Sequence, residues 1–254
     1  FKIDDGDWHE REEGLKIEVK AKNLLNLSTG ATKGAQPWIL EKEEYDHTIT
    51  LLYTFVSDIE VESAQLALED SQESSVIFNG REINMDPVGY YVDFSIKKIN
   101  IGKINIGENT VIIKKPFGVA SNTENVFILG NFGVDVVGTD VTITSPGNKL
   151  LFGDWTRQKL AFYGGRVTYR FNIEGGRNVD LRLGLFAAPC ITAELDGKKI
   201  ANISLAPYEA KLGKLSEGNH VLDINVYASR VNTFGAFHFC NGFDDWAGPT
   251  MWRT

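Results

Sequence analysis

Residue types that could contact a sugar gather towards the end of this sequence. Arg230 and Asn232 are separated by one residue, so both side chains fall on the same face of an extended strand. His238 and Asp244 follow, and Trp246 lies in a stretch containing glycine and proline that is typical of a loop. An aromatic ring packs against the C–H face of a pyranose, and planar polar groups bind its hydroxyls. These five residues form our predicted carbohydrate-binding site.

Two of the five residues have alternative interpretations that the sequence leaves open. Trp246 could plug the base of a β-sandwich instead of facing a ligand, and His238 could be a core residue among its phenylalanine neighbours. Arginine forks bind hydroxyls and carboxylates in a planar geometry, and seven of the nine arginines lie in the second half of the chain. We therefore expect any sugar site in that half.

Signatures of catalysis are weak in this sequence. Glycoside hydrolysis usually needs two carboxyl groups at a set separation, and no pair stands out among the 34 acidic residues, Glu69, Asp70, Glu194 and Asp244 included. The four histidines are scattered, and neither Gly-x-Ser-x-Gly nor His-Glu-x-x-His occurs. His220 falls in a predicted turn, where we expect it to be solvated. Whether the chain is an enzyme stays open, and we expect no catalysis by the chain on its own.

Metal-binding patterns are also weak. The acidic run Asp4-Asp5-Gly6-Asp7 offers hard oxygen ligands suited to Ca²⁺, but it lacks the spacing of a twelve-residue calcium loop. Cys190 and Cys240 give neither a disulfide framework nor a metal-type spacing. We expect no cofactor, with a structural Ca²⁺ ion as the alternative.

Charge and hydropathy narrow the possible binding partners of the protein and its possible location in the cell. The formal net charge of −8 disfavours nucleic acid, because binding phosphates needs a basic surface. No apolar run reaches the roughly 18 residues that a membrane span requires. The chain begins at Phe1 without a methionine, so we expect a processed protein or a fragment of a longer one. Its localisation, extracellular or cytoplasmic, stays open.

The sequence repeats one plan at a separation above one hundred residues. Asn79-Gly80 interrupts an apolar run as a tight hairpin turn does, and Asp196-Gly197 does the same 117 residues later. Gly107 and Gly218 each precede a further apolar run, and they lie 111 residues apart. Such a period is too long for a solenoid and suits a duplicated domain. The first 149 residues carry 14 basic and 24 acidic side chains, and the remainder carries 12 and 10.

Short alternating runs between glycine, asparagine and aspartate turns predict an all-β fold of sandwich type. We predict two tandem jelly-roll domains, residues 1–149 and 150–254. Residues 59–69 have a helix-forming composition but alternate, which favours a strand. The predicted strands cover residues 15–27, 47–56, 59–69, 90–96, 110–114, 126–129, 133–144, 167–173, 179–185, 191–195 and 221–227.

Several segments carry a resemblance to a known class of domain. They are residues 77–80, 107–111, 127–134, 162–169 and 232–235 with His238. Their order resembles the galactose-binding-like jelly rolls that accompany bacterial glycoside hydrolases, the sugar-binding domains of family-two and rhamnosidase-like enzymes. The resemblance implies a carbohydrate-binding module or accessory region that partners a catalytic domain of the same parent chain. A purely structural module and a small jelly-roll glycanase are the alternatives.

Overall fold

The computed structural model describes residues 1–12, 14–29, 45–123, 126–138, 140–147, 149–230, 233–234, 238–239 and 246–247. For Leu15, residues 238–239 and residues 246–247 it describes the backbone alone. The chain folds into two compact units, one of Phe1–Ala161 with Ala247–Thr254 and one of Phe162–Trp246. The domain boundary predicted at 149/150 stays a prediction. No helix in the described ranges is long and apolar enough to cross a membrane.

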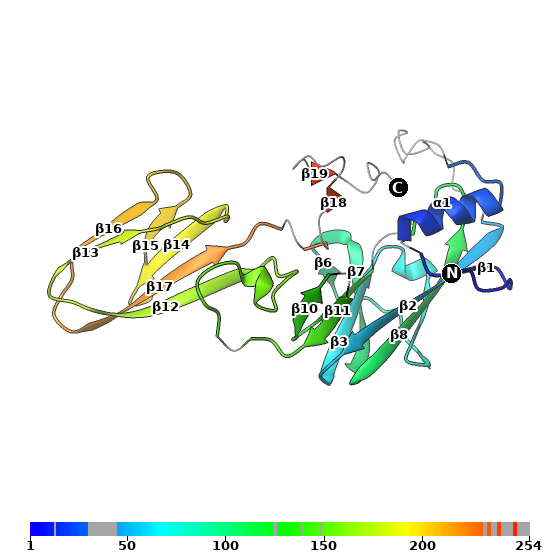
Figure 1. The fold of residues 1–254 in the computed structure, drawn as a ribbon, viewed down its shortest axis with the longest axis horizontal. Helices are drawn as coiled ribbons and strands as arrows, with labels where there is room; N and C mark the ends of the chain where they lie inside the picture. Colours follow the sequence, from blue (N-terminus) through cyan, green and yellow to red (C-terminus); the bar gives the residue numbers. More distant parts are fainter. Residues whose placement is uncertain are drawn as a thin grey trace. The chain divides into compact units, whose positions relative to one another are not determined.

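Unit 1 is built from two β-sheets (Figure 1). The larger sheet runs in the order β10 (Gly133–Val137), β11 (Asp140–Thr144), β2 (His47–Ser57), β8 (Gly107–Phe117), β4 (Ser75–Phe78) and β5 (Arg81–Glu82), and β1 (Lys2–Ile3) also pairs with β2. The smaller sheet runs in the order β6 (Tyr90–Tyr91), β7 (Asp93–Ile104), β3 (Val61–Leu68) and β9 (Phe127–Gly130). Two 3₁₀ turns cover Ser71–Glu73 and Trp155–Arg157.

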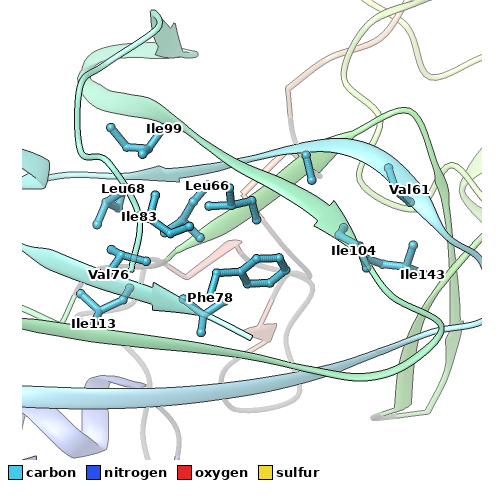
Figure 2. Close-up of a cluster of buried hydrophobic side chains, with 13 residues drawn as sticks. Val61, Leu66, Leu68, Val76, Phe78, Ile83, Ile99, Ile104, Ile113 and Ile143 are labelled. Carbon is cyan, nitrogen blue, oxygen red and sulfur yellow. The ribbon is translucent and has the colours of Figure 1, made fainter. Parts of the chain in front are cut away.

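The main core of unit 1 lies between these sheets (Figure 2). Leu66 and Ile99 come from the smaller sheet and are fully buried, and Val76, Phe78 and Ile113 face them from the larger sheet. Every second residue of a strand points to one face, so alternation in the sequence delivers these side chains to one layer. The strand over residues 59–69 is confirmed as β3.

A helix replaces the strand that we predicted over residues 15–27. It is α1 (Gly14–Leu24), and its buried side includes Glu18, Ala21 and Lys22, with Ile17 packed on the same cluster. Residues i, i+1, i+4 and i+5 share a helix face. Two of these buried positions are charged, whereas Val19 is 50% exposed. The apolar alternation was therefore misleading, because an ion pair occupies part of the buried side.

Unit 2 is smaller and uses the same plan. A four-stranded sheet runs in the order β12 (Arg166–Glu174), β17 (Asn219–Tyr227), β14 (Cys190–Leu195) and β15 (Lys198–Ile203). A two-stranded sheet pairs β13 (Asn178–Arg182) with β16 (Glu209–Lys214). Ile191, Ala193 and Leu222 form its core together with side chains from β13 and β16. Strands β18 (His238–Phe239) and β19 (Trp246–Ala247) make a separate two-stranded sheet.

The strand registers of the two units correspond residue by residue. The order β2-β8-β4-β5 of unit 1 matches β12-β17-β14-β15 of unit 2. Phe78 pairs with Val111 as Leu195 pairs with Leu222, which keeps the separations of 117 and 111 residues seen in the sequence. Gly102 and Gly213 have φ of +83° and +73° and pair next to a register shift, in β7 and β16. Only glycine adopts such φ values without strain, so both copies need it there.

The all-β fold class is confirmed, since α1 is the one α-helix among the described residues and the sheets carry both units. The jelly-roll topology stays a prediction.

Candidate functional site

The outward face of the four-stranded sheet in unit 2 carries the densest set of linked polar side chains in the described residues of that unit. We call it the polar face, and it consists of Thr168, Arg170, Thr192, Glu194, Asp223, Asn225 and Tyr227. Strand alternation explains it, because Phe171, Ala193, Leu222 and Ile224 between them point into the core. The polar face therefore looks away from β13 and β16.

Arg170 and Asp223 form the first part of the polar face. They are direct neighbours across β12 and β17, and the guanidinium Nε and Nη2 each donate to one carboxylate oxygen at 2.8 Å. This pairing raises the pKa of Arg170 and lowers the pKa of Asp223. The two bonds fix the plane of the guanidinium, and its other N–H groups remain to donate to a ligand. The Arg170 side chain is 69% exposed, so a ligand can reach it.

Asn225 forms the second part, one step further along β17. Thr168 Oγ1 donates to Asn225 Oδ1 at 2.7 Å, and Asn225 Nδ2 lies 3.0 Å from Glu194 Oε1 and 3.3 Å from Thr192 Oγ1. Asn225 and Thr192 are only 3% and 6% exposed. A buried amide with both ends bonded has one orientation, so this network holds the Glu194 carboxylate in place.

Tyr227 gives the polar face an aromatic ring. It is 37% exposed and lies two residues beyond Asn225 on the same side of β17. The set thus combines an aromatic ring with a guanidinium, carboxylates, an amide and hydroxyls, which are the groups that bind sugar rings. The chemistry available is hydrogen bonding to a hydroxyl-rich ligand.

A second feature of unit 2 is a hydrogen-bonded clasp at the β14–β15 turn. Asp196 has φ of +49°, its N–H donates to the Val221 carbonyl, and Val221 N–H donates to Asp196 Oδ1 at 2.9 Å. His220 Nδ1 lies 2.7 Å from Asp196 Oδ2, and Nε2 lies 3.0 Å from the Ser216 carbonyl and 3.2 Å from Ser216 Oγ. Our expectation that His220 is solvated was wrong, because the side chain is 12% exposed and bonded through both nitrogens.

The contact of Asp196, His220 and Ser216 brings together the residue types of a hydrolytic triad, but its geometry is that of a turn clasp. Hydrogen bonds from the ring to the Asp196 carboxylate, which has the larger effect, and to the Ser216 carbonyl raise the pKa of His220, because they favour the protonated ring. A general base needs a lone pair on Nε2 that faces the serine hydroxyl. Here the main-chain carbonyl is closer to Nε2 than the hydroxyl is.

The same clasp occurs twice in unit 1. Asn79, with φ of +47°, exchanges the equivalent bonds with Thr110, and Asn79 Nδ2 donates to Asn109 Oδ1 at 2.7 Å. Asn109 Nδ2 in turn donates to the Asn105 carbonyl, as His220 does to that of Ser216. Asp4, with φ of +49°, makes the third clasp, with His47 and Thr48. These polar groups therefore hold strand ends together, which is a structural role.

The predicted site residues fall mostly outside this description. Asn232 and Asp244 lie outside the described residues, and His238 and Trp246 lie on the paired strands β18 and β19, whose side chains are not described. Arg230 is exposed and lies just after β17. The carbohydrate-binding role of these five residues stays a prediction.

The other acidic residues weighed in the sequence have separate surroundings. Asp4 belongs to its clasp, where the Thr48 N–H and His47 lower its pKa, and Asp70 lies 3.7 Å from the Lys115 ammonium. Glu194 belongs to the polar face, and Glu69 accepts from Ser95. In the described part of the chain no group of three or more His, Cys, Asp or Glu side chains is arranged to hold a metal ion.

Sequence reasoning missed the polar face because each of its residues is an ordinary outward position on a strand. Arginine enrichment in the second half was the useful signal, and Thr-x-Arg at residues 168–170 with Asp-x-Asn at 223–225 was the readable pattern. Only the register of β12, β17 and β14 sets these side chains side by side.

Comparisons with known proteins give no family. No family model matches the chain, and no curated protein matches it. A search of solved structures finds a rhamnosidase from Novosphingobium sp. PP1Y, at 16% identity and a TM-score of 0.26, with 84% of this chain aligned to 22% of that one. It also finds a GH2 β-galacturonidase from Eisenbergiella tayi, at 8% identity and a TM-score of 0.24, with 71% of this chain aligned to 28% of that one.

A third match is an anti-sigma factor domain-containing protein, at 7% identity and a TM-score of 0.25, with 72% of this chain aligned to 75% of that one. Two of these three structures are thus glycoside hydrolases, and the chain spans about a quarter of the length of each. TM-scores this low give no basis for transferring a fold or an activity to this chain.

Proposed function

We propose that this chain is a non-catalytic carbohydrate-binding region, built from two tandem jelly-roll domains, that accompanies the catalytic domain of a glycoside hydrolase. The observation that carries the proposal is the polar face, where a fixed guanidinium, a held carboxylate and an exposed tyrosine share one side of a sheet. Such sites bind by an aromatic platform and hydrogen bonds, with affinities of about 1 µM to 1 mM.

The test is a glycan array followed by titration calorimetry on the best glycan. Arg170→Leu removes the fork from the polar face, and we expect it to weaken binding at least tenfold. Arg182→Leu is the matched control, because Arg182 is also exposed and also pairs across strands, with Glu209 at 2.7 Å, but on the β13–β16 sheet. Equal affinity of both variants and the wild type would place the site elsewhere.

The predicted tail site enters the same experiment as a separate arm. Arg230→Ala and Trp246→Ala change the residues that the sequence singled out, and Arg230 lies three residues beyond Tyr227. Loss of binding in these variants with retention in Arg170→Leu would assign the site to the tail. Absence of any glycan binding by the wild-type chain would reject the proposal.

A structural module that supports a catalytic domain is the second candidate, and one observation favours it. Leu52, Ile112 and Ile77 form a continuous row across β2, β8 and β4, and Leu52 and Ile77 are 44% and 38% exposed. Exposed apolar groups on adjacent strands are suited to packing against another domain. Leu52→Lys with Ile77→Lys should then lower the melting temperature of the full-length parent protein and leave that of this chain unchanged.

A further inference from the structure

Strands β6 and β7 lie side by side at one edge of the smaller sheet in unit 1 (Figure 1). They carry a pair of aromatic side chains, Tyr90 and Phe94. The Tyr90 and Phe94 rings have centroids 5.7 Å apart and planes inclined at 50°. Tyr90 is 56% exposed and Phe94 is 73% exposed. Burying such side chains is favourable, so two large rings left in solvent side by side require an explanation.

The backbone holds this pair in an unusual conformation. Val92, between the two rings in sequence, has φ of +62°, which is a sterically disfavoured region for a β-branched residue. Val88 N–H donates to the Lys98 carbonyl at 2.8 Å, and Lys98 N–H donates to the Gly89 carbonyl at 3.0 Å. These two bonds join the segment before β6 to β7. Strain that the surroundings maintain is concentrated at binding sites in proteins.

Tyr91 anchors the segment from the other side. Its ring lies 5.4 Å from that of Phe127 on β9, with the planes at 52°. The neighbouring ring on the sheet therefore fixes the strand that carries Tyr90, and the exposed pair is presented on a held support.

A cation lies over one of the two rings, and further polar groups lie nearby on β7. The Lys97 ammonium lies 3.6 Å from the centre of the Phe94 ring. Asp93 Oδ1 accepts from the Ser95 N–H and lies 2.8 Å from Ser95 Oγ, and the N–H bond lowers the pKa of Asp93. Ser95 Oγ also lies 3.1 Å from Glu69 Oε1. The Lys97 ammonium thus lies over one ring of the pair. The two carboxylates meet at Ser95 instead, and Asp93 and Ser95 flank Phe94 on β7, where successive side chains point to opposite faces.

We propose that Tyr90 and Phe94 form a second carbohydrate site, which stacks one pyranose ring while Lys97 binds its hydroxyls. The patch combines rings with a charged group, as sugar sites do, whereas the centres of protein interfaces are depleted of charge. This inference shares with the proposed function only the class of ligand, because the residues lie in unit 1 and the polar face lies in unit 2.

The experiment records backbone amide NMR shifts of the whole chain with a panel of neutral and uronic-acid oligosaccharides of three to six units. We expect shifts at residues 90–97 on addition of at least one glycan. Phe94→Ala and Tyr90→Ala should weaken that binding at least tenfold, and Phe94→Tyr should preserve it because the stacking face is kept. Phe152→Ala is the matched control, since Phe152 is also 73% exposed in unit 1 and should bind as the wild type does.

The outcomes separate this site from the polar face. Shifts at residues 90–97 that persist in Arg170→Leu support the second site whatever happens to the first. Shifts confined to residues 168–170, 192–194 and 223–227 would overturn the second site and keep the proposed function. Wild-type affinity of Phe94→Ala would also overturn it. So would loss of self-association of the chain in the Phe94→Ala variant without any change in glycan binding, because the rings would then be a protein contact.

Discussion

The two units share a strand register and differ in what that register presents to solvent. The row Leu52–Ile112–Ile77 of unit 1 occupies the positions that Arg170–Asp223–Glu194 occupy in unit 2. In the next row, Thr50 and Lys114 correspond to Thr168 and Asn225. The buried faces stay apolar in both units, because a core tolerates little change in polarity. Outward faces carry no such constraint, so they are where duplicated units can acquire different functions.

The clasps show the same contrast on a smaller scale. Unit 1 uses the amide of Asn109, which is fully buried, and unit 2 uses the imidazole of His220, which is partly exposed. Both donate to a main-chain carbonyl four residues earlier. An amide keeps its donors at every pH, whereas an imidazole donates from both nitrogens only when it is protonated. The geometry is therefore constant with pH in the Asn79 clasp of unit 1 and titratable in the Asp196 clasp of unit 2.

The largest effect that we predict concerns helix α1 of unit 1. Lys22 and Glu18 form an ion pair at 2.9 Å and are 3% and 8% exposed. Lys22→Met removes the ammonium from a buried carboxylate and should cost about 3 kcal/mol of the unfolding free energy of unit 1. Hydrogen exchange read by mass spectrometry assigns the loss to unit 1 peptides. Adding Glu18→Leu to Lys22→Met should restore much of the lost stability. A double variant as unstable as Lys22→Met alone would contradict the explanation.

The next largest effect is the loss of stability when the Asn79 clasp of unit 1 is broken, compared with the loss for the Asp196 clasp of unit 2. Asn109→Ala removes the partner of Asn79 and leaves main-chain groups of the 105–107 turn without theirs, in a fully buried position. We expect a loss of about 2 kcal/mol, which chemical denaturation of the variant measures. His220→Ala should cost less, because its partner Asp196 has a half-exposed side chain, so water can replace part of the lost bonding there. An equal loss in the two variants would show that exposure does not distinguish the clasps.

A smaller effect is the pH dependence of the unit 2 clasp. The pKa of His220 is raised, so its contribution to stability is complete below about pH 6.5 and is lost as pH rises through the folded-state pKa. The pKa of Asp196 is lowered, chiefly by His220, so its contribution is complete above about pH 4 and is lost as pH falls through its folded-state pKa. We therefore expect the clasp to be most stable between about pH 4 and 6.5.

Calorimetry of the wild type and of His220→Asn between pH 5 and 9 tests this expectation. The difference in melting temperature between the two proteins should shrink as pH rises, because the contribution of His220 to stability is lost. Asparagine is chosen because it is the residue that unit 1 has at the equivalent position. A difference that does not vary with pH would show that His220 is bound in one protonation state throughout.

The smallest effect should come from making the outward face of unit 2 resemble that of unit 1. Arg170→Leu with Asp223→Ile replaces the ion pair on the outward face by the residues found in the equivalent row. Surface ion pairs contribute little to folding, so thermal melting should change less than in any variant above. A large loss of stability would mean that the polar face serves folding, which would weaken its proposed role in binding.

The sequence predicted much of this architecture correctly. Turn chemistry at Asn79-Gly80 and Asp196-Gly197 located both hairpins, and the register confirms the predicted correspondence of the repeats. By residue type, Phe55 would be matched with Phe171, 116 residues later. The strand register displaces this match by two residues, because Phe55 pairs with Asn109 and its equivalent, Ile173, pairs with His220. An alignment by residue type cannot detect such a shift, since alternate positions of a strand look alike.

The sequence alone determined the fold class and the duplication, because hydrophobic alternation and turn residues are local properties. It could not determine that residues 14–24 form a helix, since Glu18 and Lys22 become compatible with burial only once they pair with each other and Glu18 also accepts from the Thr123 N–H. Nor could it determine the polar face, the clasps or the aromatic pair. Each of these depends on which residues face one another across strands that are far apart in the chain, and tertiary structure alone sets that register.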